Sequence, residues 1–190
     1  MQCVVEKQTN PYANFPREVS EEEADLRLKV INTAKKYIGL NEADGSHKQI
    51  IDQYNSHEPL AIGYRVSYTD AWCSTFVSAI SIECGLTSII PTECGCDRHI
   101  QLFKNIGSWI EDDTYVPLPG DLIFYTWKPD ESQKNCVQPS DHVGIVMGVA
   151  GSQIIVIEGN YMDSVGCRVV ALDAPVIRGF AAPDYSSLLS

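Results

Sequence analysis

The spacing of the apolar residues changes from a helical to an extended period after Gly107. Before this glycine, apolar residues recur every three or four positions, which predicts helices near residues 20–38, 47–54, 71–84 and 98–106. After it, apolar runs alternate with turn-forming residues, which predicts strands near residues 121–127, 142–149, 153–159, 166–171 and 176–181. Helices followed by strands indicate the α+β class, with N-terminal helices packed on a C-terminal antiparallel β-sheet.

Capping residues locate the starts of two of these helices. Ser20 followed by Glu23 forms a capping box, and Asp70 stands where the cap of the third helix is expected. This third helix ends at Gly85, a residue type that commonly terminates helices. Cys73 therefore lies in the first turn of a helix.

The length and composition of the chain predict one domain. Its 190 residues include no long linker rich in polar residues, proline or glycine, so we expect a single core and a monomer. The pattern divides into an irregular N-terminal arm at residues 1–19, a folded domain at residues 20–182 and a C-terminal tail at residues 183–190.

Charge and hydropathy argue against two classes of partner. The formal net charge is −11, and the 14 basic residues form no cluster beyond Lys35-Lys36, so nucleic acid is not an expected partner. No apolar run approaches the roughly 20 residues that a membrane-spanning helix needs, so insertion into a membrane is not expected either.

The N-terminus and the cysteine count bear on where the chain acts. The opening residues, MQCVVEKQTNPYANF, lack the charged region and the apolar stretch of a secretory signal. We therefore expect either export by another route or a trimmed chain. The seven cysteines are an odd number, so at least one cannot pair within the chain, and we expect most of them to be reduced thiols.

Cys73 is the first candidate for catalysis. A thiol in the first turn of a helix meets free backbone N–H groups and the positive end of the helix dipole, and both favour the reactive thiolate. Position alone does not establish this role, because cysteine is also a common small core residue.

The hairpin that contains His142 supplies a base and a group to orient it. We expect Ala150, Gly151 and Ser152 to form a three-residue loop, so that the numbers of directly opposed residues sum to 302. This register places His142 opposite Asn160 and puts Glu158 on the same face, within reach of the imidazole. Asn160 is expected to be the closer of the two. A loop of another length would move Glu158 and Asn160 to the other face of the sheet.

Metal sites have weaker support in the sequence. Cys94, Cys96 and His99 resemble half of a zinc site, but a second spaced pair of ligands is missing. The stretch at residues 41–45 is too short and has too few acidic residues for an EF-hand loop, so calcium is unsupported. We expect no metal and no cofactor.

Four blocks of this sequence resemble the CHAP family, the cysteine, histidine-dependent amidohydrolases/peptidases of phage endolysins and bacterial wall hydrolases. The resemblance extends over roughly residues 20–182, and its blocks are DAWCSTFVSAI, PGDLIFYTW, DHVGIVMGV and IIVIEGNY. The family pattern has a Cys at a helix start, a His that begins a strand, and Glu-x-Asn at the end of the next strand. These positions correspond here to Cys73, His142, Glu158 and Asn160.

The resemblance implies a papain-like fold of the CHAP and NlpC type and hydrolysis of a peptidoglycan amide bond through a cysteine thioacyl intermediate. The bond would be either the muramoyl-L-alanine link or a bond of the stem peptide or cross-bridge, and the enzyme would reach the wall by phage-type release. Some family members carry an acidic calcium loop before the cysteine, but GYRVSYTD has only one acid, so calcium is not carried over. Two alternatives remain: a papain-like cysteine peptidase or amidase acting on another substrate, and a non-catalytic wall-binding module.

Overall fold

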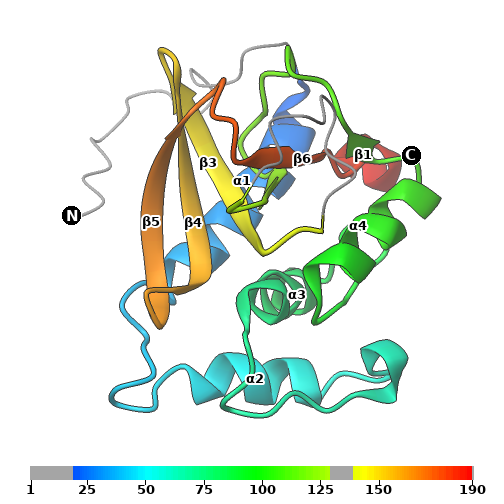
Figure 1. The fold of residues 1–190 in the computed structure, drawn as a ribbon. Coiled ribbons are helices and arrows are strands. Elements are labelled where there is room, and N and C mark those ends of the chain that lie inside the picture. Colours follow the sequence, from blue (N-terminus) through cyan, green and yellow to red (C-terminus); the bar gives the residue numbers. More distant parts are fainter. Residues whose placement is uncertain (1–18, 129–138, 190) are drawn as a thin grey trace.

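The computed structural model describes residues 19–128 and 139–189. These residues form an α+β fold, as the hydrophobic pattern predicts (Figure 1). The helices come first and are α1 (Glu21–Lys35), α2 (Lys48–Asn55), α3 (Cys73–Cys84) and α4 (Cys96–Asn105). The strands follow and are β1 (Trp109–Ile110), β2 (Leu122–Tyr125), β3 (His142–Ala150), β4 (Gln153–Tyr161), β5 (Ser164–Ala171) and β6 (Ile177–Ala181). Two short 3-10 helices, η1 (Ala61–Gly63) and η2 (Tyr185–Leu189), complete the described elements.

The strands form one antiparallel six-stranded sheet in the order β1-β6-β2-β3-β4-β5. Strands β3, β4 and β5 are consecutive in the chain and lie side by side, while β6 returns to pair with both β1 and β2 (Figure 1). The sequence pattern did not reveal β1, because a strand of two residues is too short to display a period.

Helix α3 lies at the centre of the main core. It packs against β3 and β4, and α2 covers its side away from the sheet (Figure 1). Almost every residue of α3 is buried, which fits a helix that is surrounded by other elements. The opposite face of the sheet has a smaller apolar cluster, made of Ile123, Tyr125, Val146, Ile154, Val156 and Phe180.

The helix boundaries confirm one predicted cap and correct the other. The Ser20 side chain accepts a hydrogen bond from the Glu23 N–H at 3.1 Å, as the capping box predicts. Asp70 does not cap α3. Its carboxylate instead accepts hydrogen bonds from the Ser67 N–H at 2.7 Å and the Tyr64 hydroxyl at 2.8 Å, and α3 begins directly at Cys73. The hydrogen bond between the Ser67 N–H and the Asp70 carboxylate closes a turn that precedes α3, so Asp70 does not start the helix.

The β3–β4 hairpin reaches the expected register by an unexpected route. The expectation of a three-residue loop is wrong: Ala150 pairs with Gln153, so the turn contains only Gly151 and Ser152. The numbers of opposed residues next to the turn therefore sum to 303 instead of 302. A β-bulge at Met147 adds one unpaired residue to β3, and beyond it Ile145 pairs with Ile157, which restores the sum of 302. The predicted register is thus correct as far as Ile145 and Ile157, where the β3–β4 pairing ends, because the bulge compensates for the shorter turn.

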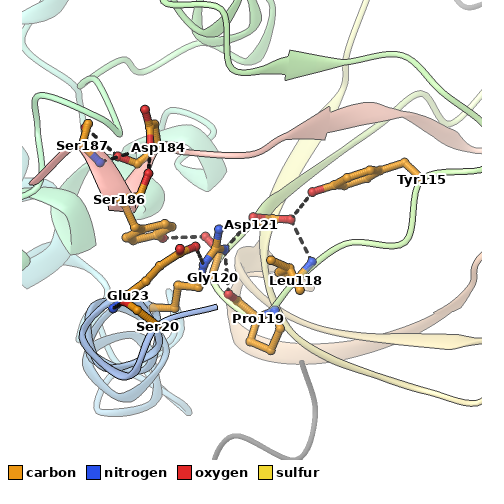
Figure 2. Close-up of polar contacts among 12 residues, drawn as sticks. Ser20, Glu23, Tyr115, Leu118, Pro119, Gly120, Asp121, Asp184, Ser186 and Ser187 are labelled. Carbon is orange, nitrogen blue, oxygen red and sulfur yellow. Dashed lines mark hydrogen bonds and ion pairs between the residues drawn. The ribbon is translucent and has the colours of Figure 1, made fainter. Parts of the chain in front are cut away.

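A buried ion pair joins α1 to the start of β2. Arg27 Nη1 lies 2.8 Å from Asp121 Oδ1, and both side chains are almost completely inaccessible to solvent. The other oxygen of Asp121 accepts hydrogen bonds from the Tyr115 hydroxyl at 2.6 Å and the Leu118 N–H at 2.8 Å (Figure 2). Every oxygen of this buried carboxylate therefore has a partner.

The segments expected as an N-terminal arm and a C-terminal tail flank the folded domain. The arm expected at residues 1–19 lies almost entirely outside the described residues. In the segment expected as a C-terminal tail, Tyr185 is fully buried, and its hydroxyl donates a hydrogen bond to the Gly120 carbonyl at 2.7 Å. Across residues 19–128 and 139–189, no helix has both the length and the apolar composition needed to cross a membrane.

Candidate active site

Cys73 is the first residue of α3, and its surroundings fix it there. Trp72, which precedes it, is fully buried and donates its indole N–H to Glu42 Oε1 at 2.9 Å. One turn later, Phe76 packs so closely on β4 that a Cβ atom added to Gly159 would lie 2.3 Å from the Phe76 Cβ. The absence of a side chain at Gly159 therefore allows the start of α3 to approach the sheet closely.

The start of α3 also leaves backbone N–H groups available near the sulfur. The first hydrogen bond of the helical ladder runs from the Phe76 N–H to the Trp72 carbonyl at 2.8 Å, so the preceding N–H groups have no partner within the helix. The Ser74 backbone N–H contributes to the lowered pKa of Cys73. Anionic groups are stabilised at this position by the same N–H groups and by the helix dipole.

His142 is the first residue of β3, and its ring contacts the Cys73 side chain. The imidazole packs against two aromatic rings, with centroid distances of 5.9 Å to Tyr125 and 5.7 Å to Trp127. Ser140 secures the backbone at this point, because its hydroxyl lies within hydrogen-bond distance of the carbonyls of His142 and Tyr125. The ring is therefore held by tilted contacts with two aromatic rings and by a backbone that is fixed at the start of the strand.

Glu158 binds the histidine ring from the neighbouring strand β4. Its Oε2 lies 3.0 Å from His142 Nε2, and the carboxylate is completely buried. This contact occupies Nε2, so Nδ1 is the ring nitrogen that remains for the interaction of His142 with the Cys73 thiol. The same carboxylate accepts hydrogen bonds from Arg168 Nε on β5, at 2.9 Å and 3.0 Å. A buried carboxylate with two cationic partners is well placed to hold the histidine in one orientation.

The charges of these groups shift their pKa values in directions that favour an ion pair. Burial lowers the pKa of His142, but hydrogen bonds to Cys73 and Glu158, together with their charges, outweigh it and raise this pKa to about 9. The hydrogen bond with Cys96, followed by the contact with His142, holds the pKa of Cys73 well below its ordinary value, although burial acts in the opposite direction. Burial likewise raises the pKa of Glu158, and His142 and Arg168 overcome it and lower that pKa. Both the lowered pKa of Cys73 and the raised pKa of His142 favour a thiolate beside an imidazolium.

In the described residues no hydrogen bond joins Asn160 to the histidine ring, although Asn160 was expected to be the closer of the two orienting residues. Its backbone has φ 55°, and it lies where the register of the β4–β5 ladder shifts between Glu158 and Tyr161. Within the described part of the chain, its side chain forms no hydrogen bond. Asparagine tolerates left-handed backbone better than most residues do, so the local backbone by itself accounts for its presence.

Two further residues lie at the site, although neither was predicted from the sequence. Cys96, the first residue of α4, lies with its sulfur 3.6 Å from the Cys73 sulfur. Arg168 lies between aromatic rings, 4.8 Å from the ring centroid of Trp127 and 4.6 Å from that of Tyr161, and it contacts Glu158. A pairing argument for β5 would have placed Arg168 near Glu158, whereas no local pattern relates Cys96 to Cys73.

The residues considered for zinc have other partners. His99 is fully buried, with Nδ1 at 2.9 Å from the Ser74 hydroxyl and Nε2 at 2.8 Å from the Pro91 carbonyl. Burial lowers its pKa to about 4, so it stays neutral. Where the chain is described, no three His, Cys, Asp or Glu side chains are grouped closely enough to hold a metal ion. Cys73, Cys84, Cys94 and Cys96 are free thiols, whereas Cys167 is disulfide-bonded.

Comparison with known proteins identifies one family. Residues 63–160, a little over half of the chain, match the profile of the CHAP domain. The matched segment contains Cys73, His142, Glu158 and Asn160. Neither the curated proteins nor the solved structures gave a match to this chain.

Proposed function

This chain belongs to the CHAP family, and on that premise we propose that it hydrolyses an amide bond of bacterial peptidoglycan, with Cys73 as the nucleophile and His142 as the general base and acid. CHAP domains are generally cysteine- and histidine-dependent hydrolases. The observation that carries the proposal for this chain is the contact of the Cys73 thiol with His142, whose other side is bound by the buried Glu158. A nucleophile, a base and a group that orients the base are the components of covalent acyl transfer.

The proposed reaction begins from the thiolate–imidazolium pair. The Cys73 thiolate attacks the amide carbonyl, and the negative charge on the carbonyl oxygen is stabilised by N–H groups at the start of α3. The His142 imidazolium donates its proton to the leaving amine as the C–N bond breaks, which leaves a thioester on Cys73. The neutral His142 then takes a proton from water, the hydroxide attacks the thioester, and the carboxylic acid product leaves as the thiolate forms again.

Glu158 and Asn160 have different parts in this proposal. Glu158 holds the ring through Nε2 and stabilises the imidazolium, so it is a positioning residue that acts through His142. Asn160 shapes the end of β4 through its left-handed backbone, and its side chain has no part in the proposed proton transfers.

The substrate class rests on the family. The order of helices and sheet is compatible with the papain-like arrangement of CHAP and NlpC-type enzymes, and we propose that fold for this chain. The scissile bond is either the muramoyl-L-alanine amide or a bond within the stem peptide or cross-bridge. We propose no metal or cofactor in this chemistry, and we propose that the protein acts as a monomer on the wall after phage-type release.

The test is digestion of purified peptidoglycan of known composition. Wild-type protein should release new amine and carboxylate ends, and mass spectrometry of the soluble fragments should show one type of cleaved amide bond. Cys73→Ala should abolish this release, whereas Cys84→Ala, which changes a buried thiol on the same helix, should retain it. Sedimentation of the wild-type protein with the walls without any release of ends would instead identify a wall-binding module.

A further inference from the structure

Two free thiols meet at the starts of two helices. The sulfur of Cys73, at the first position of α3, lies 3.6 Å from the sulfur of Cys96, at the first position of α4. Cys73 is 5% exposed and Cys96 is 9% exposed, so water has little access to either sulfur. A buried thiol group and a buried thiolate at this distance can form an S–H···S⁻ hydrogen bond.

The placement of Cys96 is secured by the next residue of α4. Asp97 Oδ1 accepts a hydrogen bond from the Ser140 N–H at 2.7 Å, and Ser140 in turn binds the His142 carbonyl. This contact ties the start of α4 to the start of β3, so Cys96, Cys73 and His142 are held together by three elements. Cys96 is therefore part of a constrained arrangement around the nucleophile.

From this geometry we propose that Cys96 is a positioning residue whose S–H group donates a hydrogen bond to the Cys73 thiolate and so keeps the nucleophile ionised. The inference rests on the proposed function in taking Cys73 as the nucleophile. Cys96 does not touch the substrate carbonyl and forms no covalent bond in the reaction. Its proton stays on its own sulfur, and its effect is to stabilise negative charge on Cys73 before attack.

The other charged groups near the two sulfurs determine which of them ionises. Cys73 faces His142 on β3, which carries the positive charge and is itself bound by Glu158 on β4. Cys96 faces the Cys73 sulfur and lies near the acidic side chains of Asp97 and Asp141. The contact with Cys73, followed by burial and these negative charges, holds the pKa of Cys96 well above its ordinary value. Cys96 therefore remains the protonated partner and Cys73 becomes the thiolate.

The experiment measures the ionisation of Cys73 without requiring turnover. The full chain is alkylated with iodoacetamide under a reducing agent across a series of pH values, and peptide mapping by mass spectrometry follows the modification of Cys73 alone. We expect Cys96→Ala to raise the pH midpoint of Cys73 alkylation by about one unit or more. Cys96→Ser, whose hydroxyl can still donate, should recover most of that shift. In wild-type and variant alike, the acidic limb of the pH profile for wall hydrolysis should move with the alkylation midpoint.

Cys94→Ser is the matched control, because Cys94 is a free thiol two residues before Cys96 in the sequence. The sulfur that forms the hydrogen bond with Cys73 is that of Cys96, not that of Cys94. Cys94→Ser should leave the midpoint unchanged. An unchanged midpoint in Cys96→Ala, or an equal shift in Cys96→Ala and Cys96→Ser, overturns the inference. Cys96→Val provides a second variant without a donor, in case Cys96→Ala fails to fold.

Failure of the inference can be told apart from failure of the proposed function. If Cys73→Ala still cleaves peptidoglycan, the proposed function falls, while the alkylation midpoint continues to report on the sulfur pair. If Cys73→Ala is inactive and the Cys96 variants leave the midpoint unmoved, only the inference falls.

Discussion

Glu158 is the residue on which the charges of the site converge. Its carboxylate binds His142 at 3.0 Å and Arg168 at 2.9 Å, from two different strands, with no exposure to solvent. The negative charge of Glu158 contributes to the raised pKa of His142, which is about 9. Because His142 must be protonated to assist the leaving amine, the charge of Glu158 sets the upper pH limit of the proposed activity.

Replacement of Glu158 by glutamine should therefore move this limit. The amide keeps a similar shape but loses the negative charge, so the imidazolium loses its proton at a lower pH. We expect the basic limb of the pH profile of kcat/KM, near pH 9 in the wild type, to shift downward, and kcat to fall about a hundredfold or more. Glu83→Gln changes a carboxylate on the surface of α3 and should leave the profile unmoved. A basic limb that stays near pH 9 in Glu158→Gln would contradict this role.

Asn160 gives a second test at the scale of one residue. Its φ of 55° lies in the left-handed region, where glycine is unstrained and a β-branched residue is not. Asn160→Gly should keep both stability and wall hydrolysis, whereas Asn160→Val should lower the free energy of unfolding by about 1–2 kcal/mol in a denaturant titration. Loss of hydrolysis in a stable Asn160→Gly protein would show that the side chain takes part in the chemistry.

Local sequence patterns predicted some residues of the candidate site and not others. Cys73, His142 and Glu158 were predicted together because a helix start and the period-two register of a hairpin are local patterns. Cys96 was not predicted. It lies 23 residues after Cys73 in the chain, and the contact of the two sulfurs depends on how their two helices pack together. Local periodicity describes which face of a helix is buried, and it does not specify which other helix start lies beside it.

The β3–β4 hairpin is the element that brings His142 and Glu158 onto one face. The predicted register was correct although the predicted turn was wrong, since the bulge at Met147 offsets the shorter turn. A bulge has no reliable signal in a single sequence. Neither the bulge nor the shorter turn that it offsets could therefore be predicted. The register at the site therefore depends on both irregularities being present.

The contact of α3 with β4 yields a prediction at the scale of elements. A Cβ atom on Gly159 would lie 2.3 Å from Phe76 Cβ, so Gly159→Ala must push the start of α3 away from the sheet. We expect a loss of about 1–3 kcal/mol in the free energy of unfolding, together with weaker hydrolysis because Cys73 moves relative to His142. Denaturant titration of Gly159→Ala, Phe76→Gly and the double variant measures the coupling, because only glycine at position 76 removes the Cβ atom that clashes.

If the clash with Phe76 is the cause, the double variant should lose less stability than the sum of the two single variants. Additive losses would show that Gly159 matters for a reason unrelated to the approach of α3.

At the scale of the whole molecule, the Arg27–Asp121 pair connects the first helix to the start of β2 in the sheet. Removal of one partner leaves a buried charge uncompensated, so Arg27→Ala should lower the free energy of unfolding by about 3–5 kcal/mol. Lys36→Ala breaks an exposed ion pair with Glu83 and should leave the unfolding midpoint nearly unchanged. Equal effects of the two changes in urea titrations would contradict the structural role of the buried pair.

The overall order of the fold was predicted because the change from helical to extended period covers most of the chain. The partners across the molecule were not predictable in the same way. Arg27 pairs with a residue 94 positions later, and Tyr185, in the segment expected as a tail, completes that region by binding the Gly120 carbonyl. Such contacts join elements that have no sequence relationship, and only the packed structure reveals them.

In the proposed reaction, the Cys73 sulfur forms a covalent bond with the acyl group of the substrate. The most direct test of this bond is acid quenching of the enzyme during turnover of a purified muropeptide, followed by mass spectrometry of the peptide that contains Cys73. We expect an acyl adduct on Cys73 that appears as the amine is released and disappears as the carboxylic acid product forms. Release of amine at the wild-type rate by Cys73→Ala, with no adduct on Cys73 in the wild type, would contradict the proposed reaction.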